Sequence, residues 1–278
     1  MKSEFVPFIR ESGVPSGVPL VFFHGFPGSH LQAAILEPFA EKFAIRILAP
    51  DRPGYGFSDP LSGKGIRDFI SGLDRALERK GVDKFYVVGV SGGNPSAICA
   101  AGHFGDRVLA VGSICGLAPY PEAREYFYKF AKTGLDVAMR TPEFLMKTIV
   151  NQFIKGINPE DKIDLMISHL DEADRQALSN LQVRQALLQS MDLARRQGAA
   201  GIVFDLKSFS SPWPVDWAAI KSPHYLWHGK QDRVLSYGMS EYVHRKIPHS
   251  KLKLYPEDGH YSLPILRAGE ILADLTGA

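Results

Sequence analysis

The sequence is poor in the residues that build metal, redox and disulfide sites. Among its 278 residues are two cysteines, Cys99 and Cys115, and neither a Cys-x-x-Cys nor a His-Glu-x-x-His pattern occurs. Two lone cysteines give no disulfide framework and no zinc site. We therefore expect no metal and no cofactor. Both cysteines are expected to fill space in the core, although Cys115 ends an apolar run and is able to approach a site.

An excess of charge of one sign is also missing. Lys and Arg number 32 and Asp and Glu number 30, which gives a formal net charge of +2. A surface so nearly balanced does not favour nucleic acid or an anionic membrane as a partner. The expected partner is a small-molecule substrate, and the composition leaves the oligomeric state open.

Long hydrophobic runs are absent. The longest apolar stretch, residues 108–118, is too short and too often interrupted by glycine to span a bilayer. The first seven residues contain no apolar region of the signal-peptide type. We therefore expect a cytoplasmic protein without a membrane-spanning segment.

The chain does contain an alternation of short apolar runs with amphipathic stretches. This alternation is typical of strands that alternate with helices, and it indicates a parallel sheet covered on both faces. The predicted fold class is therefore α/β. The predicted strands are residues 19–24, 45–49, 84–90, 108–115, 224–227 and 251–255. The predicted helices are residues 29–43, 66–80, 94–101, 237–247 and 264–275.

The middle of the chain differs, because we find no convincing strand between about residues 117 and 200. Three stretches place a capping side chain before proline or an acid, which is typical of a helix start. They begin at Thr141, Asn158 and Asp171. We predict an α/β core formed by residues 1–116 and 206–278, into which a helical cap of residues 117–205 is inserted.

The most informative motif is Gly-Val-Ser-Gly-Gly at residues 89–93. It lies between a predicted strand and a predicted helix, which is the setting of a nucleophile elbow. The turn is so tight that the residues two before and two after the serine can carry almost no side chain. Ser91 is therefore the candidate nucleophile, at the amino end of a helix, where negative charge is favoured.

A serine hydroxyl needs a base to take its proton, and the base needs a carboxylate to fix its tautomer. His260 is the candidate base, in the loop between the last predicted strand and the last predicted helix. Asp232 is the candidate acid, because it follows the predicted strand 224–227. Asp205 and Asp216 remain alternatives on neighbouring segments. Parallel strands end at one edge of a sheet, so we expect these loops to meet there.

Backbone N–H groups are needed to stabilise the oxyanion that forms when the serine attacks. The candidates are the N–H of Gly92, directly after the nucleophile, and that of Phe26, in the loop after the first predicted strand. Trp213 and Trp217 precede the acid-bearing strand and are candidate walls of the substrate pocket. Packing beneath the cap is the alternative role for both tryptophans.

Two further histidines, His24 and His228, lie at the ends of predicted strands. Each is followed by glycine in a similar context. We expect both to be structural and to hold their own loops by hydrogen bonds.

These motifs resemble the α/β-hydrolase superfamily over nearly the whole chain. The resemblance implies a mostly parallel, eight-stranded sheet flanked by helices, with an all-helical cap inserted after the sixth strand. It also implies that the second motif shapes the loop after its strand. The five motifs that carry the resemblance are residues 24–28, 51–58, 89–93, 229–232 and 259–260.

On this basis we expect a serine hydrolase that forms an acyl-enzyme on Ser91 and cleaves a carboxylic ester of a small-to-medium apolar substrate. A serine at the elbow disfavours dehalogenase and epoxide hydrolase chemistry, because relatives with those activities attack with an aspartate. Other relatives with the same three residues hydrolyse carbon–carbon bonds, and some act as small-molecule receptors. A prolyl aminopeptidase is a further alternative, although Phe26 replaces a glycine of that group. That activity also needs cap carboxylates, for which Glu122, Glu125 and Glu143 are available.

Overall fold

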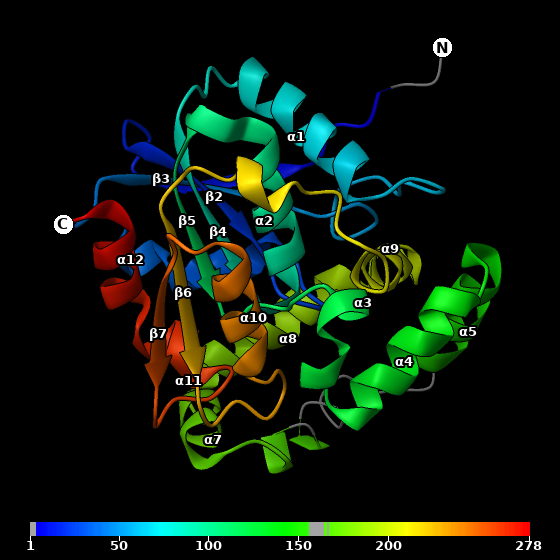
Figure 1. The fold of residues 1–278 in the computed structure, drawn as a ribbon. Helices are drawn as coiled ribbons and strands as arrows, with labels where there is room; N and C mark the ends of the chain where they lie inside the picture. Colours follow the sequence, from blue (N-terminus) through cyan, green and yellow to red (C-terminus); the bar gives the residue numbers. More distant parts are fainter. Residues whose placement is uncertain (1–3, 156–163, 166) are drawn as a thin grey trace.

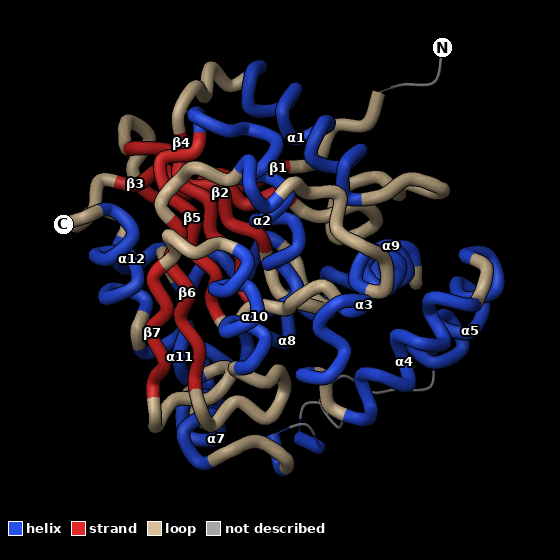
Figure 2. The backbone as a smooth tube through the Cα atoms, in the orientation of Figure 1, coloured by secondary structure: helices blue, strands red, loops and turns tan. Residues whose placement is uncertain are grey.

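The computed structural model describes residues 4–155, 164–165 and 167–278. Within them seven strands form one sheet in the order β1-β3-β2-β4-β5-β6-β7, and only β1 is antiparallel to its neighbour. Helices lie on both sides of the sheet (Figures 1 and 2). The predicted α/β class with a mostly parallel sheet is therefore confirmed. The strands are β1 (Ile9–Gly13), β2 (Val18–Phe23), β3 (Ile45–Pro50), β4 (Phe85–Val90), β5 (Val108–Ile114), β6 (His224–Gly229) and β7 (Lys251–Tyr255).

The sheet has seven strands in the described residues, not the eight that the family resemblance implied. All six strands predicted from the sequence are present, and β1 is added at one edge. Its sequence, Ile-Arg-Glu-Ser-Gly, lacks the apolar run of a central strand. This composition suits an edge strand, and β1 pairs with β3 alone. Before β1, Phe5 packs against Phe69 of helix α1 (Ile66–Arg79). Residues 4–8 therefore pack against a helix and do not form a further strand.

Alternate residues of each central strand enter one of two apolar layers. In β4, Val87 packs in the layer formed with α1 and α2 (Asn94–Phe104), whereas Val88 packs in the opposite layer. Helix α10 (Gly238–Lys246) belongs to the first layer and α12 (Ala268–Thr276) to the second. The sheet is thus buried on both faces.

Two of the predicted helices have a different form in the structure. Residues 29–43 form two short 3₁₀ turns, His30–Ile35 and Glu37–Phe39, and not one helix. Pro38 has no N–H with which to continue a helical hydrogen-bond ladder. The last predicted helix is divided into α11 (Ser262–Leu266) and α12.

Between β5 and β6 the described residues form helices and no strand, and these helices lie on the side of the strands' carboxyl ends (Figure 1). Two predicted helix starts are confirmed, at Glu143 and at Glu172. The third, at Asn158, lies outside the described residues. The cap boundaries stay a prediction. None of the described helices is long and apolar enough to cross a membrane. The helices of this segment are α3 (Tyr120–Ala123), α4 (Lys129–Arg140), α5 (Glu143–Lys155), α7 (Glu172–Leu178), α8 (Leu181–Ala194) and α9 (Ala200–Phe209).

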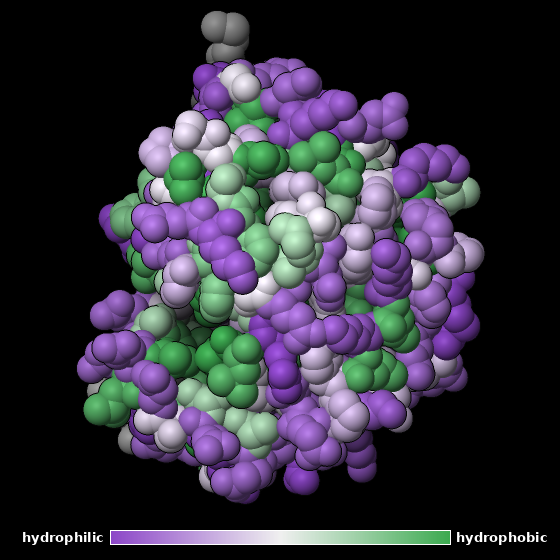
Figure 3. All heavy atoms as spheres, turned by 90° about the vertical axis from the view of Figure 1, so that its left-hand side faces the viewer, coloured by the Kyte–Doolittle hydropathy of each residue, from purple (hydrophilic) through white to green (hydrophobic). Residues whose placement is uncertain are grey.

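Strand β7 is an edge strand, since it pairs only with β6. Its two lysines, Lys251 and Lys253, lie over the rings of Tyr225 and Tyr255 at 5.2 and 5.3 Å. Figure 3 views the side of the molecule on which α12 and β7 lie, and it shows hydrophilic side chains interspersed with hydrophobic ones. Lysines on an edge strand oppose pairing with the edge of another chain. This side of the sheet is therefore protected against edge-to-edge aggregation.

The layer between the sheet and α1 should carry much of the stability. Leu73 of α1 is fully buried, so we expect Leu73→Ala to lower the free energy of unfolding by about 3 kcal/mol. Leu266→Ala is the matched control, because that side chain is 62% exposed, and it should change stability by about 0.5 kcal/mol or less. Urea unfolding followed by circular dichroism measures both. Equal losses in the two variants would contradict this description of the core.

Candidate active site

The loops that carry the candidate residues leave the sheet at one place. Strand β2 pairs with β3 on one side and with β4 on the other, so the connections after β2 and β4 depart in opposite directions. Such a switch in strand order opens a crevice at the carboxyl ends of the strands. Phe26 follows β2 and Ser91 follows β4. The predicted oxyanion donor and the predicted nucleophile therefore lie at the same crevice.

Ser91 occupies a tight turn between β4 and α2, and its backbone has a φ of +53°. Glycine is required on both sides of it. A Cβ at Gly89 would lie 2.7 Å from the Cβ of Ala97 on α2. A Cβ at Gly93 would lie 2.2 Å from the carbonyl oxygen of Phe23, at the end of β2. These close approaches account for the glycines two before and two after the serine.

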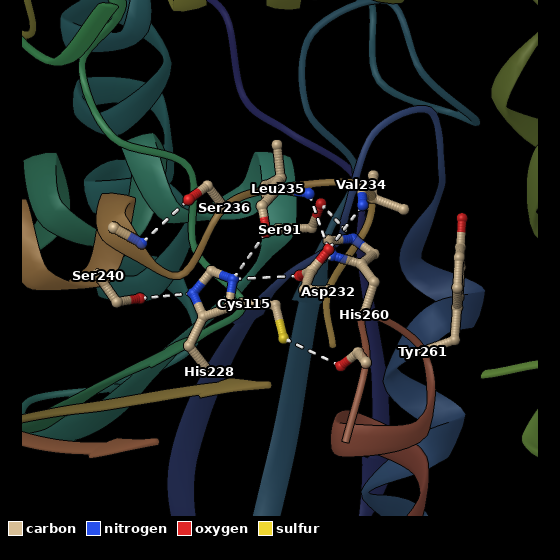
Figure 4. A network of polar contacts seen from close by, with 12 residues as sticks. Ser91, Cys115, His228, Asp232, Val234, Leu235, Ser236, Ser240, His260 and Tyr261 are labelled. Carbon is tan, nitrogen blue, oxygen red and sulfur yellow. Dashed lines mark hydrogen bonds and ion pairs between the residues drawn. The ribbon is translucent and has the colours of Figure 1, made fainter. Parts of the chain in front are cut away.

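His260 and Asp232 continue from Ser91 in a chain of hydrogen bonds (Figure 4). The Nε2 atom of His260 lies 3.0 Å from the Oγ of Ser91, and its Nδ1 lies 2.7 Å from the Oδ2 of Asp232. An ionised carboxylate can only accept, so Nδ1 carries the proton and Nε2 accepts the hydroxyl proton of Ser91. The arrangement is able to move a proton from Ser91 to His260.

Burial and charge set the protonation states of this chain. Burial lowers the pKa of His260, but the charge and hydrogen bond of Asp232, with the charge of Asp174, outweigh it and raise that pKa above 6.5. Burial alone would raise the pKa of Asp232, but the charge of His260 and hydrogen bonds from His228 and His260 hold it well below its usual range. Asp232 is therefore ionised, and His260 is a stronger base than a free imidazole.

His228 supports Asp232, a role beyond the loop-holding one expected from the sequence. Its Nε2 lies 3.1 Å from both the Oδ2 of Asp232 and the carbonyl oxygen of Leu235, so this nitrogen carries a proton. Its Nδ1 lies 2.7 Å from the Oγ of Ser240. The N–H groups of Val234 and Leu235 donate to the other carboxylate oxygen at 2.8 and 2.7 Å. These donors offset the loss of water around the buried carboxylate.

The two alternative acids, Asp205 and Asp216, have hydrogen-bond partners other than His260. Asp205 of α9 accepts hydrogen bonds from the buried guanidinium of Arg52 at 2.9 and 2.6 Å. Asp216 accepts the N–H of Ala218 at 3.0 Å and caps a 3₁₀ turn. Of the three candidate acids, Asp232 is the one that contacts His260.

The loop of Phe26 lies close to Gly92. A Cβ at Gly92 would lie 2.6 Å from the Cβ of Phe26 and 3.3 Å from its backbone nitrogen. Arg52 donates to the carbonyl oxygens of His24 and Gly25, which fixes the two peptide planes before Phe26. His24 holds its own loop, with its Nδ1 donating to the carbonyl oxygen of Gly25 at 2.9 Å, and its Nε2 accepts the N–H of Arg52 from the loop after β3 at 3.3 Å. The backbones of Phe26 and Gly92 thus border one small space, in which the sequence predicts an oxyanion hole.

The two predicted pocket tryptophans pack together. Trp213 is buried and stacks on Trp217 with the ring centroids 6.1 Å apart. Val215, between them in the chain, lies against Gly102 on the last turns of α2, whereas Ser91 precedes the first turn of that helix. These contacts describe packing against α2, and a role of the tryptophans in the pocket stays a prediction.

A different aromatic pair lies next to Gly92. Phe209 of α9 meets Phe26 edge to face, with the ring centroids 5.4 Å apart. Its ring tip would lie 3.0 Å from a Cβ at Gly92. Phe26 is 36% exposed, so part of this apolar surface remains available to a ligand. The sequence did not identify Phe209, because an apolar residue in a helix carries no signal that separates a pocket wall from core.

The helical segment between β5 and β6 contacts the loops of the acid and the base. The hydroxyl of Tyr128, just before α4, donates to the carbonyl oxygen of Asp232 at 2.8 Å. Asp174 of α7 accepts the N–H of His260 at 2.8 Å. The sequence analysis missed both residues, since an aromatic residue or an acid at a helix start has the appearance of ordinary packing or capping.

Cys115 directly follows β5, and its thiol donates to the carbonyl oxygen of Gly259 at 3.7 Å. Its sulfur and the polar atoms of Asp232 and His260 lie within 4.8 Å of one another. A metal would need the thiolate. Burial, followed by the charge of Asp232, raises the pKa of Cys115 well above 9.0. Asp232 and His260 are hydrogen-bonded to each other, so two of these three groups are already engaged.

Comparison with known proteins connects the fold to one family. A family model described as the alpha/beta hydrolase fold matches residues 18–264. Juvenile hormone epoxide hydrolase 1 of Ctenocephalides felis is 24% identical over 254 residues, which cover 86% of this chain and 50% of the relative. This chain thus spans about half the length of that relative. AB hydrolase superfamily protein YisY of Bacillus subtilis is 24% identical over 261 residues, with coverages of 91% and 88%.

Solved structures show the same fold. The esterase (EaEST) from Exiguobacterium antarcticum superposes with a TM-score of 0.69, covering 98% of this chain and 95% of its own. Its identity to this chain is 18%, so the likeness describes the fold and not the reaction.

The contact between Asp232 and His260 has a measurable consequence. We expect the imidazole of His260 to titrate above 6.5 in the wild-type protein. In Asp232→Asn burial remains while the charge is lost, so its pKa should fall below 6.5. In the wild type, the neutral form of His260, which can accept a proton, predominates only above the raised pKa. The stabilisation from the protonated pair is full below about 6.5 and is lost as the pH rises through the raised value.

NMR titration of the imidazole protons measures this pKa. Asp216→Asn is the matched control, because it removes an equal charge from a residue that caps another turn, and it should leave the pKa of His260 unchanged. An identical pKa in the wild type and in Asp232→Asn would contradict the proposed pairing.

Proposed function

The chain belongs to the alpha/beta hydrolase fold family, and from this premise we propose that it is a serine hydrolase that cleaves carboxylic esters. The observation that carries the proposal is the buried chain of hydrogen bonds from Ser91 through His260 to Asp232. A hydroxyl that donates to the free nitrogen of an imidazole, itself oriented by a carboxylate, is an activated nucleophile.

The proposed reaction has two halves. The Oγ of Ser91 attacks the ester carbonyl carbon while its proton passes to the Nε2 of His260, and the carbonyl oxygen becomes an oxyanion. When the tetrahedral intermediate collapses, the bond to the leaving oxygen breaks and His260 gives the proton to that oxygen, which releases the alcohol. Water then attacks the acyl-enzyme, again losing a proton to His260. The acid is released and the proton returns to Ser91.

The oxyanion would be held by the N–H groups of Gly92 and Phe26. The close approach of these two residues supports this assignment. The amino end of α2, which begins three residues after Ser91, adds a favourable dipole. Arg52, fixed by Asp205, would keep the Phe26 loop in place as charge develops.

The aromatic surface near Gly92 supports a small-to-medium apolar acyl or alcohol group as the substrate. Phe26 and Phe209 contribute aromatic surface next to Gly92. An aminopeptidase would need a carboxylate free to bind the substrate amine. Glu143 is instead paired with Lys147 at 2.7 Å and accepts the N–H of Gly63 at 3.0 Å. Glu143 is thus engaged elsewhere, whereas Glu122 and Glu125, the other two carboxylates available for that activity, are exposed.

We expect the purified protein to hydrolyse p-nitrophenyl acetate, butyrate and octanoate. Ser91→Ala should lower kcat/KM by about 10⁴-fold or more, because the nucleophile is lost. Ser71→Ala is the matched control, since that hydroxyl bonds only within α1 to the carbonyl oxygen of Arg67, and it should keep full activity. The release of p-nitrophenol measures the activity of the wild type and of the two variants.

Equal turnover in the wild type and in Ser91→Ala would contradict ester hydrolysis at this site. Ligand binding without turnover would favour a receptor of the same fold, and cleavage of a diketone alone would favour carbon–carbon bond hydrolysis.

A further inference from the structure

The carboxylate of Asp174 connects the helical segment between β5 and β6 to the loop of His260. Asp174 of α7 is fully buried, and its Oδ2 accepts the N–H of His260 at 2.8 Å. Its Oδ1 accepts the N–H groups of Tyr261 and Ser262 at 2.9 and 2.7 Å, and the hydroxyl of Ser262 at 2.8 Å. Asp174 and His260 are 86 residues apart in the chain. The contact is therefore a tertiary one between two elements.

These N–H groups need an acceptor because they lie at the start of α11. The first N–H groups of a helix have no partner within it and are usually satisfied by a local capping side chain. The cap residue of α11, Tyr261, makes no side-chain capping bond. Asp174 supplies the acceptor from another helix, and its negative charge suits the amino end of α11.

The carboxylate reaches the backbone because the residue before His260 is glycine. A Cβ at Gly259 would lie 2.6 Å from the Oδ1 of Asp174 and 2.1 Å from the Oδ2 of Asp171. Asp171 in turn accepts the N–H of Asp174 at 3.0 Å and begins α7. The start of α7 and the Gly259–His260 turn thus fit against each other.

Asp174 also contributes charge near the imidazole. Two carboxylates face His260: Asp232 at its Nδ1 and Asp174 at its backbone N–H. Both oppose the effect of burial, which lowers the pKa of His260. The neighbouring thiol of Cys115 and phenol of Tyr261 have raised pKa values, mainly through burial, and stay neutral near pH 7.

We propose that Asp174 is a positioning residue for His260, through which the helical segment between β5 and β6 sets the orientation of the catalytic base. The proposal rests on the proposed function of His260. An unsupported turn at residues 259–262 would let the imidazole move relative to the Oγ of Ser91, 3.0 Å away. Displacements of about 1 Å in a catalytic group lower rates by about 100-fold.

The test uses Asp174→Asn in the full chain. The change keeps the size and one acceptor oxygen but removes the charge and places an N–H group against a backbone donor. We expect kcat for p-nitrophenyl butyrate to fall by about 10- to 100-fold, with KM changed by less than about 3-fold. We also expect the pKa of His260, measured by NMR titration, to fall, because a negative charge that raises it is lost.

Glu172→Gln is the matched control. It removes the same charge from the same helix, but its side chain is 81% exposed and pairs with Arg175, so neither kcat nor the pKa of His260 should change. A folded Asp174→Asn protein with both quantities at their wild-type values would overturn the proposal. The same shift in Glu172→Gln would also overturn it, because the effect would then be one of general charge.

A thermal melt shows whether Asp174→Asn is folded. If it is not, Ser262→Ala decides, because it removes the hydroxyl that donates to Asp174 and accepts the N–H of Gly259 at 2.7 Å, so that the turn loses this link to the carboxylate while the charge stays in place. We then expect kcat to fall by about 3-fold or more, and an unchanged kcat would overturn the proposal. The NMR titration needs no substrate. A protein that hydrolyses no ester but shows the pKa shift would therefore contradict the proposed function and not the position of Asp174.

Discussion

The hydrogen bond between Asp232 and His260, 2.7 Å long and shielded from water, is the interaction on which the candidate site depends. It places the imidazole proton on Nδ1, and this choice leaves Nε2 free to accept the proton of Ser91. A buried carboxylate is costly without donors, and Asp232 receives them from His228 and from the backbone of the following turn. The surrounding loops therefore supply hydrogen-bond donors to Asp232 as well as the tight turn of Ser91.

The sheet brings these loops together, and the helical segment between β5 and β6 fixes them from the other side. Tyr128 bonds to the backbone of Asp232, and Asp174 bonds to the backbone of His260. Asp205 holds Arg52, which in turn holds the carbonyl groups before Phe26. The segment thus contacts the loops of Asp232 and His260, and through Arg52 that of Phe26, by polar side chains. It acts on the geometry of the site in addition to any role in enclosing a substrate.

Local chemistry made part of this predictable from the sequence. Gly89 and Gly93 lie where a Cβ atom would collide with neighbouring atoms. Because only a tight turn requires glycine at both positions, the motif identified the turn directly. Apolar strands buried on both faces were equally visible. Strand β1 was not, because an edge strand of polar composition has no periodic apolar pattern. The apolar pattern of residues 29–43 predicted one helix, whereas Pro38, which lacks an N–H, favours the two short 3₁₀ turns that are present.

The supporting residues required long-range contacts that no local pattern reveals. His228 resembled His24, a loop-holding histidine, and only the fold shows that its ring reaches Asp232. Asp174 resembled any acid in the first turn of a helix, and its partners lie 86 to 88 residues away. Phe209 and the two tryptophans are all aromatic residues near the end of the helical segment, and composition alone cannot tell which of them borders Gly92.

Reaction with a fluorophosphonate shows whether Ser91 is an activated nucleophile. The intact protein is incubated with the reagent at neutral pH, digested, and mapped by mass spectrometry. We predict a phosphonyl group on Ser91 in the folded protein and none on Ser91 in protein unfolded in urea, where His260 and Asp232 no longer activate it. A folded protein in which Ser91 stays unmodified, or in which it reacts no faster than in the unfolded chain, would show that Ser91 is not activated.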